Sequence, residues 1–235
     1  MSEAIVPHGG YRTFDDFFTR KLREGARVAD PDPRAVLSPA DGRVEDLGPI
    51  DPAATLMVKG KRYEVSDLVG DRAAAERYRG GTFFIVYLSP RDYHRVHAPV
   101  SGPVARVRYV PGTLYPVNAI GLGHVPQLFA RNERMAIVQD SETHGEVTTV
   151  MVGAIGVGRI GLSFDDVESN AGHTPGTRDY GGDGPPMERA EELGVFHLGS
   201  TAIVFVGPEV SLDFAIEPGE HVRVGQAVAR GKEGR

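Results

Sequence analysis

The sequence has 235 residues, with 26 Lys and Arg against 32 Asp and Glu, and its net charge of −6 disfavours a nucleic-acid-binding protein. Its 30 glycines and 17 prolines favour short strands joined by turns and disfavour a helical bundle. The absence of cysteine excludes disulfides, a thiolate nucleophile and cysteine-based metal sites.

The first residues lack the pattern of a secretory signal. Residues 1–11 contain no basic stretch followed by an apolar one. The longest apolar runs, at 81–88, 150–162 and 201–207, are shorter than the roughly 18 residues that a transmembrane helix needs. We therefore expect a protein of a cytoplasm-like compartment, which can still bind a membrane surface.

Residues 11–24 show the pattern of an amphipathic helix. Thr13 and Asp16 have the spacing of a capping box, and basic residues precede the glycine that ends the segment. The apolar residues share one face: Phe14, Phe17, Phe18 and Leu22. Two interpretations stay open. The helix caps the core, or it presses its three phenylalanines into lipid with its cations toward the headgroups.

A turn containing Pro and Gly, followed by an alternating strand, recurs at 38–44, 98–104 and 217–222. The third copy continues into 224–228 and resembles the closing hairpin of biotinyl, lipoyl and sugar-phosphotransferase carrier domains. Repeats of this kind indicate architecture. We predict an α+β fold, mainly β, with a barrel-sandwich-hybrid-like core and a few short peripheral helices.

Two further segments differ from the strands around them. Residues 66–78 are rich in alanine and charge, which predicts a second short helix. Residues 170–188 consist of turn formers and polar residues, which predicts a long surface loop. Neither has the composition of an interdomain linker, so we expect a single domain over residues 1–235.

His94 and His97 lie where an apolar strand at 82–88 opens into a loop. An H-x-x-H spacing alone is a weak signal, but packing does not explain so many titratable groups at a strand end. The charged neighbours are Arg91, Asp92 and Arg95. The remaining histidines are expected to be structural or exposed: His124, His144, His173, His197 and His221.

Two more segments contain groups suited to catalysis. Asp41 precedes a glycine at the start of a strand, where Asp-Gly is most often only a turn, yet an aspartate can also fix the tautomer of a catalytic histidine. Ser200 follows Gly199 and leads into an apolar strand at 202–206. A serine at such a turn can attack the preceding carbonyl, because glycine has no side chain to block the approach.

Together these segments resemble phosphatidylserine decarboxylase of the bacterial type, a family of pyruvoyl-dependent proenzymes. The matching segments are YRTFDDFFTR at 11–20, SPADG at 38–42, YLSPRDYHRVH at 87–97, LFARNER at 128–134, VGA at 152–154 and LGST at 198–201. They keep the family's order through most of the chain. No single motif is specific for the family, but the combination of YLSPRDYHRVH with LGST is.

The resemblance implies that the chain cuts itself between Gly199 and Ser200. Asp41 and His97 match the family residues that act with this serine as a protease-like triad. In that scheme His97 takes the Ser200 proton while Asp41 orients the imidazole. The hydroxyl attacks the Gly199 carbonyl to give an ester, β-elimination leaves dehydroalanine, and hydrolysis yields a pyruvoyl group.

The products implied are a β chain, residues 1–199, and an α chain, residues 200–235, which begins with the covalent pyruvoyl group. This group is the only cofactor that the family implies, and no metal is expected. Its ketone condenses with the substrate amine as a Schiff base and accepts the electrons released as CO2 leaves. His94 is the expected donor of the final proton to carbon, with His97 as the alternative.

The implied substrate is phosphatidylserine, and the products are phosphatidylethanolamine and CO2. A lipid substrate requires contact with a bilayer, so Phe14, Phe17 and Phe18 are the expected docking residues. The family also implies a peripheral position on the cytoplasmic face of the membrane and a homodimer. Relatives usually carry a longer apolar region before this helix, whereas residues 1–10 precede it here, so a soluble amino acid stays open as substrate.

Two other functions compete with this one. A zinc hydrolase of the lysostaphin type would take ligands from His94, His97, Asp41 and His124, but its H-x-H motif is absent and LGST would have no role. A carrier-like binding module needs a lysine at a hairpin tip, and residues 218–220 contain none.

Overall fold

The computed structural model describes residues 2–155, 159–170, 175–197 and 200–232. Its strands are β1 (Ala35–Leu37), β2 (Gly42–Pro49), β3 (Thr55–Val58), β4 (Lys61–Glu64), β5 (Thr82–Leu88), β6 (Arg95–His97), β7 (Val104–Val110), β8 (Arg134–Ser141), β9 (Gly145–Val152), β10 (Ile160–Leu162), β11 (Gly176–Asp179), β12 (Glu192–Phe196), β13 (Ser200–Val206), β14 (Leu212–Phe214), β15 (His221–Val222) and β16 (Ala227–Gly231). The helices are α1 (Phe14–Phe18), α2 (Val65–Val69), α3 (Arg72–Ala75), η1 (Glu76–Tyr78), α4 (Ala119–His124), α5 (Leu128–Arg131) and η2 (Gly181–Asp183). Strands therefore dominate and the helices are short, which confirms the predicted α+β, mainly β class.

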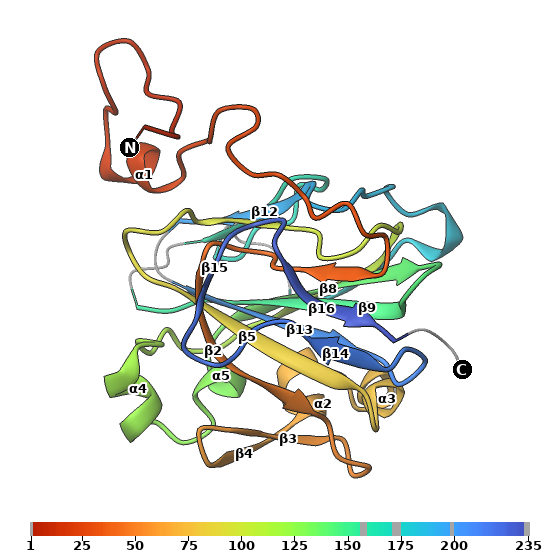
Figure 1. Ribbon diagram of the computed structural model, residues 1–235. Coiled ribbons are helices and arrows are strands. Elements are labelled where there is room, and N and C mark those ends of the chain that lie inside the picture. Colours follow the sequence, from red (N-terminus) through yellow and green to blue (C-terminus); the bar gives the residue numbers. More distant parts are fainter. Residues whose placement is uncertain (1, 156–158, 171–174, 198–199, 233–235) are drawn as a thin grey trace.

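An antiparallel sheet of eight strands, in the order β11-β7-β8-β9-β13-β5-β2-β15, forms the centre of the fold (Figure 1). Strand β13 pairs with β9 on one side and β5 on the other, and all of its residues are buried. Both β5 and β13 consist largely of β-branched and aromatic residues, which suit a buried sheet. Two three-stranded sheets, β1-β16-β14 and β10-β12-β6, and the β3-β4 hairpin complete the structure.

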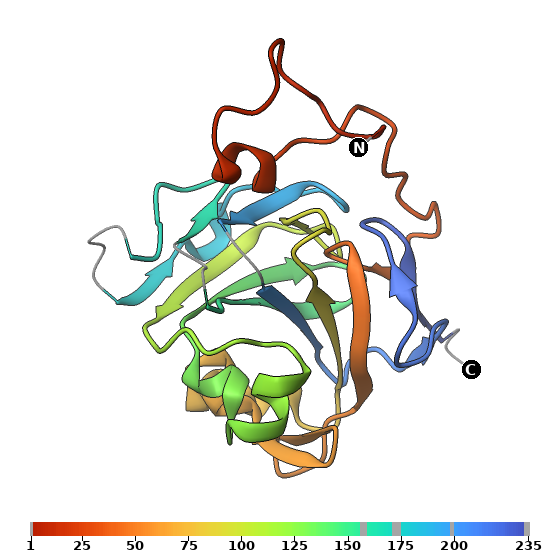
Figure 2. The ribbon, with the colours of Figure 1, turned by 90° about the vertical axis from the view of Figure 1, so that its left-hand side faces the viewer.

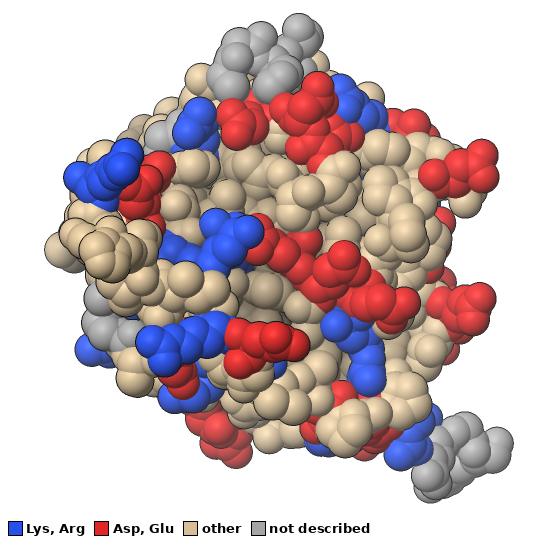
Figure 3. Space-filling model, turned by 90° about the horizontal axis from the view of Figure 1, so that it is seen from above, with Lys and Arg blue, Asp and Glu red and all other residues tan. Residues whose placement is uncertain are grey.

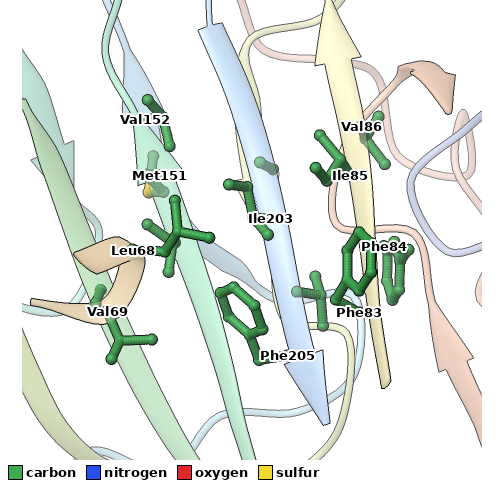
Figure 4. Packing of buried hydrophobic residues seen from close by; sticks show 14 of the residues in the cluster. Leu68, Val69, Phe83, Phe84, Ile85, Val86, Met151, Val152, Ile203 and Phe205 are labelled. Atoms are coloured by element: carbon green, nitrogen blue, oxygen red, sulfur yellow. The ribbon is translucent and has the colours of Figure 1, made fainter. Parts of the chain in front are cut away.

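The helix α2 covers one face of this sheet. Its Leu68 and Val69 point toward side chains of β9 and β13, including Met151 and Phe205 (Figure 4). Leu68, Met151 and Phe205 are fully buried. The main apolar cluster draws residues from Val36 to Ala229, so most of the chain shares one core.

The predicted helix at 11–24 is much shorter in the structure. Its start is confirmed, because Thr13 and Asp16 form the reciprocal hydrogen bonds of a capping box at the beginning of α1. Its predicted end is wrong. The following residues pair with the N-terminal segment instead, through an isolated bridge between Ala4 and Leu22 and a hydrogen bond from the Arg23 amide to a backbone carbonyl.

The two other irregular segments also differ from expectation. The predicted helix at 66–78 is divided, because Gly70 ends α2 in a left-handed conformation and Asp71 caps a new helix, α3. The predicted loop at 170–188 contains the strand β11, which pairs with β7. Among the described residues, no helix is long and apolar enough to cross a membrane.

The recurring turns of the sequence lie close together in space. The first and third copies pair directly, since the Val44 amide donates to the Glu220 carbonyl and the Gly219 amide to the Val44 carbonyl, each at 2.8 Å. The second copy adjoins them through a 3.0 Å hydrogen bond from the Leu37 amide to the Pro99 carbonyl.

Candidate active site

The motif segments meet at one end of the eight-stranded sheet. Tyr87 of β5 pairs with Arg43 of β2 and with Thr201 of β13. Thr201 in turn pairs with Val152 of β9, which pairs with Arg134 of β8. Because neighbouring strands are antiparallel, the beginnings of β2, β13 and β8 and the ends of β5 and β9 lie side by side at the same end of the sheet. We call this row of strand ends the sheet edge.

Each predicted site residue is at or next to this edge. Asp41 immediately precedes β2, and Ser200 is the first residue of β13, paired with the last residue of β5. His94 and His97 follow β5, and the amide of Phe196 donates to the His94 carbonyl at 3.0 Å. Gly199, the other half of the predicted cleavage bond, lies outside the described residues.

His94 is completely buried. Its Nδ1 lies 2.9 Å from the Asp92 carbonyl oxygen, which can only accept, so Nδ1 carries the proton. Its ring packs on Phe18 with the two ring centroids 3.9 Å apart. Burial lowers the pKa of His94 to about 4. At neutral pH the ring is therefore uncharged, and its buried Nε2 has no hydrogen-bond partner in the described part of the chain.

His97 is held at both ring nitrogens. Nδ1 lies 2.7 Å from the Ala190 carbonyl, to which it donates, and the Tyr93 hydroxyl lies 3.1 Å from Nε2, to which it donates. Burial lowers the pKa of His97, and the contact with Ala190 and the nearby charges of Glu192 and Asp41 oppose this effect. Ala190 itself has a left-handed backbone with φ of 62°.

Asp41 binds an arginine that the sequence did not single out. The Arg27 guanidinium donates to both carboxylate oxygens, from Nε to Oδ1 at 2.8 Å, and the Val224 amide donates to Oδ1 at 2.9 Å. Arg27 also pairs with Glu3 at 3.0 Å. Between the described side chains of Asp41 and His97 there is no hydrogen bond, so Asp41 acts on His97 through its charge.

Ser200 is completely buried, and its Oγ has no hydrogen-bond partner among the described residues. Leaving a buried hydroxyl unpaired costs about 1–3 kcal/mol. Other buried hydroxyls in the described residues, those of Thr149 and Thr201 among them, are unpaired in the same way. What distinguishes Ser200 is its position at the start of β13, directly after a glycine.

A polar layer that the sequence left without a role supports this edge of the sheet. Asn132 donates to the carbonyls of Tyr115 and Gly153 at 2.7 and 2.8 Å. The buried Glu133 accepts from the Tyr109 hydroxyl at 2.9 Å. The sequence signal that could have indicated this layer was the polar run 131–133 directly before the buried strand β8.

The three phenylalanines of α1 do not share one environment. Phe18 is completely buried against His94, whereas Phe14 is 61% exposed and Phe17 is half-buried beneath the Arg20 guanidinium. The prediction that Phe18 contacts lipid is therefore wrong, because its ring is part of the histidine environment.

The other histidines have separate surroundings. His144 is buried on the Arg34 carbonyl, His197 pairs with Asp15, and His221 is exposed. His173 lies outside the described residues. In the described part of the chain, no three His, Asp or Glu side chains are placed to hold a metal ion, so the zinc ligands of the alternative reading are not brought together.

The fold and the site define a mainly β protein with a buried serine, a buried histidine and a half-buried histidine at one end of its central sheet. Residues 14–230 match the family model described as phosphatidylserine decarboxylase. The phosphatidylserine decarboxylase proenzyme of Xanthomonas axonopodis pv. citri (strain 306) is 44% identical over 233 residues, 98% of this chain and 83% of that relative. The proenzyme of that name from Brevibacillus brevis is 40% identical over 228 residues, 96% of this chain and 81% of that relative. The chain belongs to the phosphatidylserine decarboxylase family.

Proposed function

We propose that this chain is a self-processing decarboxylase that converts phosphatidylserine to phosphatidylethanolamine and CO2 with a pyruvoyl group made from Ser200. Membership of the family and the names of the relatives support the substrate and the precursor state. The observation that carries the proposal is the buried Ser200 hydroxyl, which has no partner among the described residues and lies at the sheet edge where the His94 and His97 segments meet.

His97 supplies the base for self-cleavage. The Ala190 carbonyl holds its proton on Nδ1, so the Nε2 lone pair is free to accept the Ser200 proton when the serine replaces the Tyr93 hydroxyl there. The negative charge of Asp41, fixed by Arg27, then stabilises the imidazolium that forms.

The bond changes balance without an outside reagent other than water. Ser200 Oγ attacks the Gly199 carbonyl carbon, the amide bond breaks, and the proton held by His97 goes to the released amine, which leaves an ester. In the β-elimination a base takes the Cα proton of residue 200 and the Cβ–Oγ bond breaks, which gives the Gly199 carboxylate and leaves dehydroalanine at position 200. Hydrolysis releases ammonia and leaves the pyruvoyl group at the start of residues 200–235.

In the mature enzyme the pyruvoyl carbonyl supplies an electron sink for the bond to the departing carboxylate. His94 provides the proton. Its Nε2 is an acceptor at neutral pH, and a negatively charged substrate nearby favours protonation of that nitrogen. The protonated Nε2 then donates to the substrate carbon that has lost CO2, a step in which a positioned acid contributes roughly 10²–10⁴-fold.

The N-terminal segment provides the membrane contact in this proposal. A pocket of about 460 Å³ at this segment is lined by Arg12, Arg20 and Lys21, and the exposed Phe14 lies on the adjoining helix. Figure 3 shows basic and acidic side chains interspersed over the face that carries the segment, so headgroup attraction there would be local. This arrangement supports peripheral binding at the cytoplasmic face of the membrane.

Decarboxylation is tested with carboxyl-labelled phosphatidylserine in mixed micelles and, in parallel, with labelled free serine. We expect labelled CO2 from the lipid and none from Ser200→Ala. Release from free serine but not from the lipid would favour the soluble amino-acid alternative. Release from neither substrate by a fully cleaved chain would contradict the proposed activity.

The roles of the two histidines are separated by His97→Gln and His94→Gln. We expect His97→Gln to remain uncut. His94→Gln should cut itself but lose most of its decarboxylation, since only the final proton is missing. A His94→Gln enzyme with full turnover would assign that proton to His97 instead.

A homodimer is proposed from the family resemblance alone. Sedimentation equilibrium of the mature enzyme should give twice the mass of one β and one α chain. A mass equal to a single pair would contradict it.

A further inference from the structure

A hydrogen bond between side chains joins α1 to the chain that leads into the cleavage bond. His197 Nδ1 lies 2.9 and 3.1 Å from the two carboxylate oxygens of Asp15. His197 is the last described residue before Ser200, whereas Asp15 is 182 positions away in the sequence. The His197 side chain is 17% exposed and that of Asp15 is 47% exposed.

The helix that carries Asp15 is itself fixed to the histidine segment. Arg20 donates from Nη2 to the carbonyls of Arg91 and Asp92 at 3.0 Å. In the opposite direction, Arg95 donates to the Thr19 carbonyl from Nε at 3.0 Å and from Nη2 at 2.7 Å. Figures 1 and 2 show α1 lying above β12, the strand that ends just before His197. The helix therefore contacts both segments that the cleavage reaction must bring together.

The chain on either side of the cleavage bond is held by backbone pairing. Upstream, the His197 amide donates to the Arg159 carbonyl at 3.0 Å. Downstream, Ser200 pairs with Leu88. The strand β12, which ends one residue before His197, pairs directly with β6 of the histidine segment, and Arg95 pairs with Glu192 at 2.5 Å. The bond to Asp15 adds a side-chain contact at His197, the described residue nearest the cleavage bond on the upstream side.

We propose that Asp15 and His197 are positioning residues for self-cleavage, which set the chain entering the Gly199–Ser200 bond relative to the His94–His97 segment. The proposal rests on the self-processing role of Ser200. It predicts an effect on the rate of cleavage and little effect on decarboxylation after cleavage, because His197 is then near the free end of the β chain.

A positioning role affects the rate of cleavage far more than the stability of the folded chain. Attack on a carbonyl requires close alignment, and a displacement of about 1 Å can slow a reaction as much as 10²-fold. A partly exposed side-chain pair of this kind contributes little to stability. Its loss should lower the melting temperature of the uncut Ser200→Ala chain by no more than about 4 °C for a protein of this size.

The test measures the cleavage rate of the full chain made by cell-free synthesis with a pulse of labelled methionine. All five methionines precede Ser200, so precursor and β chain appear on one gel. Asp15→Ala and His197→Ala should each slow cleavage about tenfold, and the double variant should be no slower than either. His197→Asn should recover most of the rate, because its amide nitrogen can donate from the position of Nδ1.

Matched controls are Asp213→Ala, which breaks an exposed ion pair with Lys232, and His221→Ala, both of which should cleave at the parent rate. Decarboxylation per cleaved molecule should stay within about twofold in every variant. If the parent cleaves while Asp15→Ala and His197→Ala match it, or if their effects simply multiply, the positioning role is refuted. If the parent itself stays uncut, the self-processing role fails, and this proposal fails with it.

Discussion

The burial of His94 predicts how acid destabilises the uncut chain. Its pKa is lowered from an ordinary 6.5 to about 4, chiefly because burial disfavours the charged ring. Between these pH values the unfolded chain binds a proton that the folded chain does not. The contribution of neutral His94 is therefore complete above the unfolded pKa and is lost as pH falls toward 4. A pKa difference of this size corresponds to about 3 kcal/mol of unfolding free energy.

The assay is urea unfolding of the Ser200→Ala chain at about pH 7 and about pH 4, compared with the same chain carrying His94→Gln. Burial also lowers the pKa values of His97 and His144, so both proteins weaken in acid. The variant should lose about 3 kcal/mol less than its parent over this range. His221→Gln, at an exposed position, should lose as much as the parent. Equal losses in the parent and in His94→Gln would refute the reasoning.

Two further predictions concern packing. Phe18→Ala should lower the unfolding free energy by about 3–5 kcal/mol, because Phe18 is completely buried. It should also admit water and so raise the pKa of His94, which nuclear magnetic resonance titration of the ring would show. Phe14→Ala, at an exposed position, should change stability by less than about 0.5 kcal/mol and weaken binding to anionic vesicles. Equal stability losses would place Phe18 outside the core. Gly42→Ala should lower the unfolding free energy by about 1–3 kcal/mol or more, because a Cβ there would lie 2.3 Å from the Tyr87 carbonyl oxygen. Gly123→Ala, where an added Cβ meets no described atom outside its helix within 4 Å, should leave the unfolding free energy unchanged or raise it by up to about 1 kcal/mol. Urea unfolding distinguishes these results, and a neutral Gly42→Ala would contradict the close approach of β2 to β5.

Local signals predicted the beginnings of elements better than their ends. The capping box at Thr13 fixed the start of α1, because both partners lie within four residues of each other. The helix ends early through contacts with residues 3–5, which no local pattern in 19–24 encodes. In the same way, β11 depends on its pairing with β7, so its polar sequence looked like a loop.

The residues of the candidate site that carry reactive side chains could be selected from the sequence, whereas their hydrogen-bond partners could not. The motifs singled out Asp41, His94 and His97, and the structure brings all three to the sheet edge where β13 begins with Ser200. Their partners were less visible. The acceptor for His97 Nδ1 is the backbone carbonyl of Ala190, 93 positions away. Because every residue has a backbone carbonyl, residue identity cannot indicate which one accepts this hydrogen bond.

The partner of Asp41 was hidden for a related reason. Arg27 lies in an irregular segment that carries no motif, among many other basic residues near the N-terminus. Its hydrogen bonds to both oxygens of the Asp41 carboxylate form only when that segment folds back over the sheet edge. The family resemblance predicted that Asp41 orients the His97 imidazole. Among the described side chains the two are not hydrogen-bonded, and the charge of Asp41 instead opposes, from a distance, the lowering of the His97 pKa by burial.

The most direct test of the account is the intact mass of the purified protein under denaturing conditions, for the parent chain and for Ser200→Ala. Self-processing at Ser200 predicts two fragments from the parent, residues 1–199 and residues 200–235, with the smaller one lighter by one ammonia than a peptide that begins with serine. Ser200→Ala should remain a single chain. A parent of undivided 25.3 kDa mass would contradict self-processing at Ser200 and the pyruvoyl chemistry derived from it.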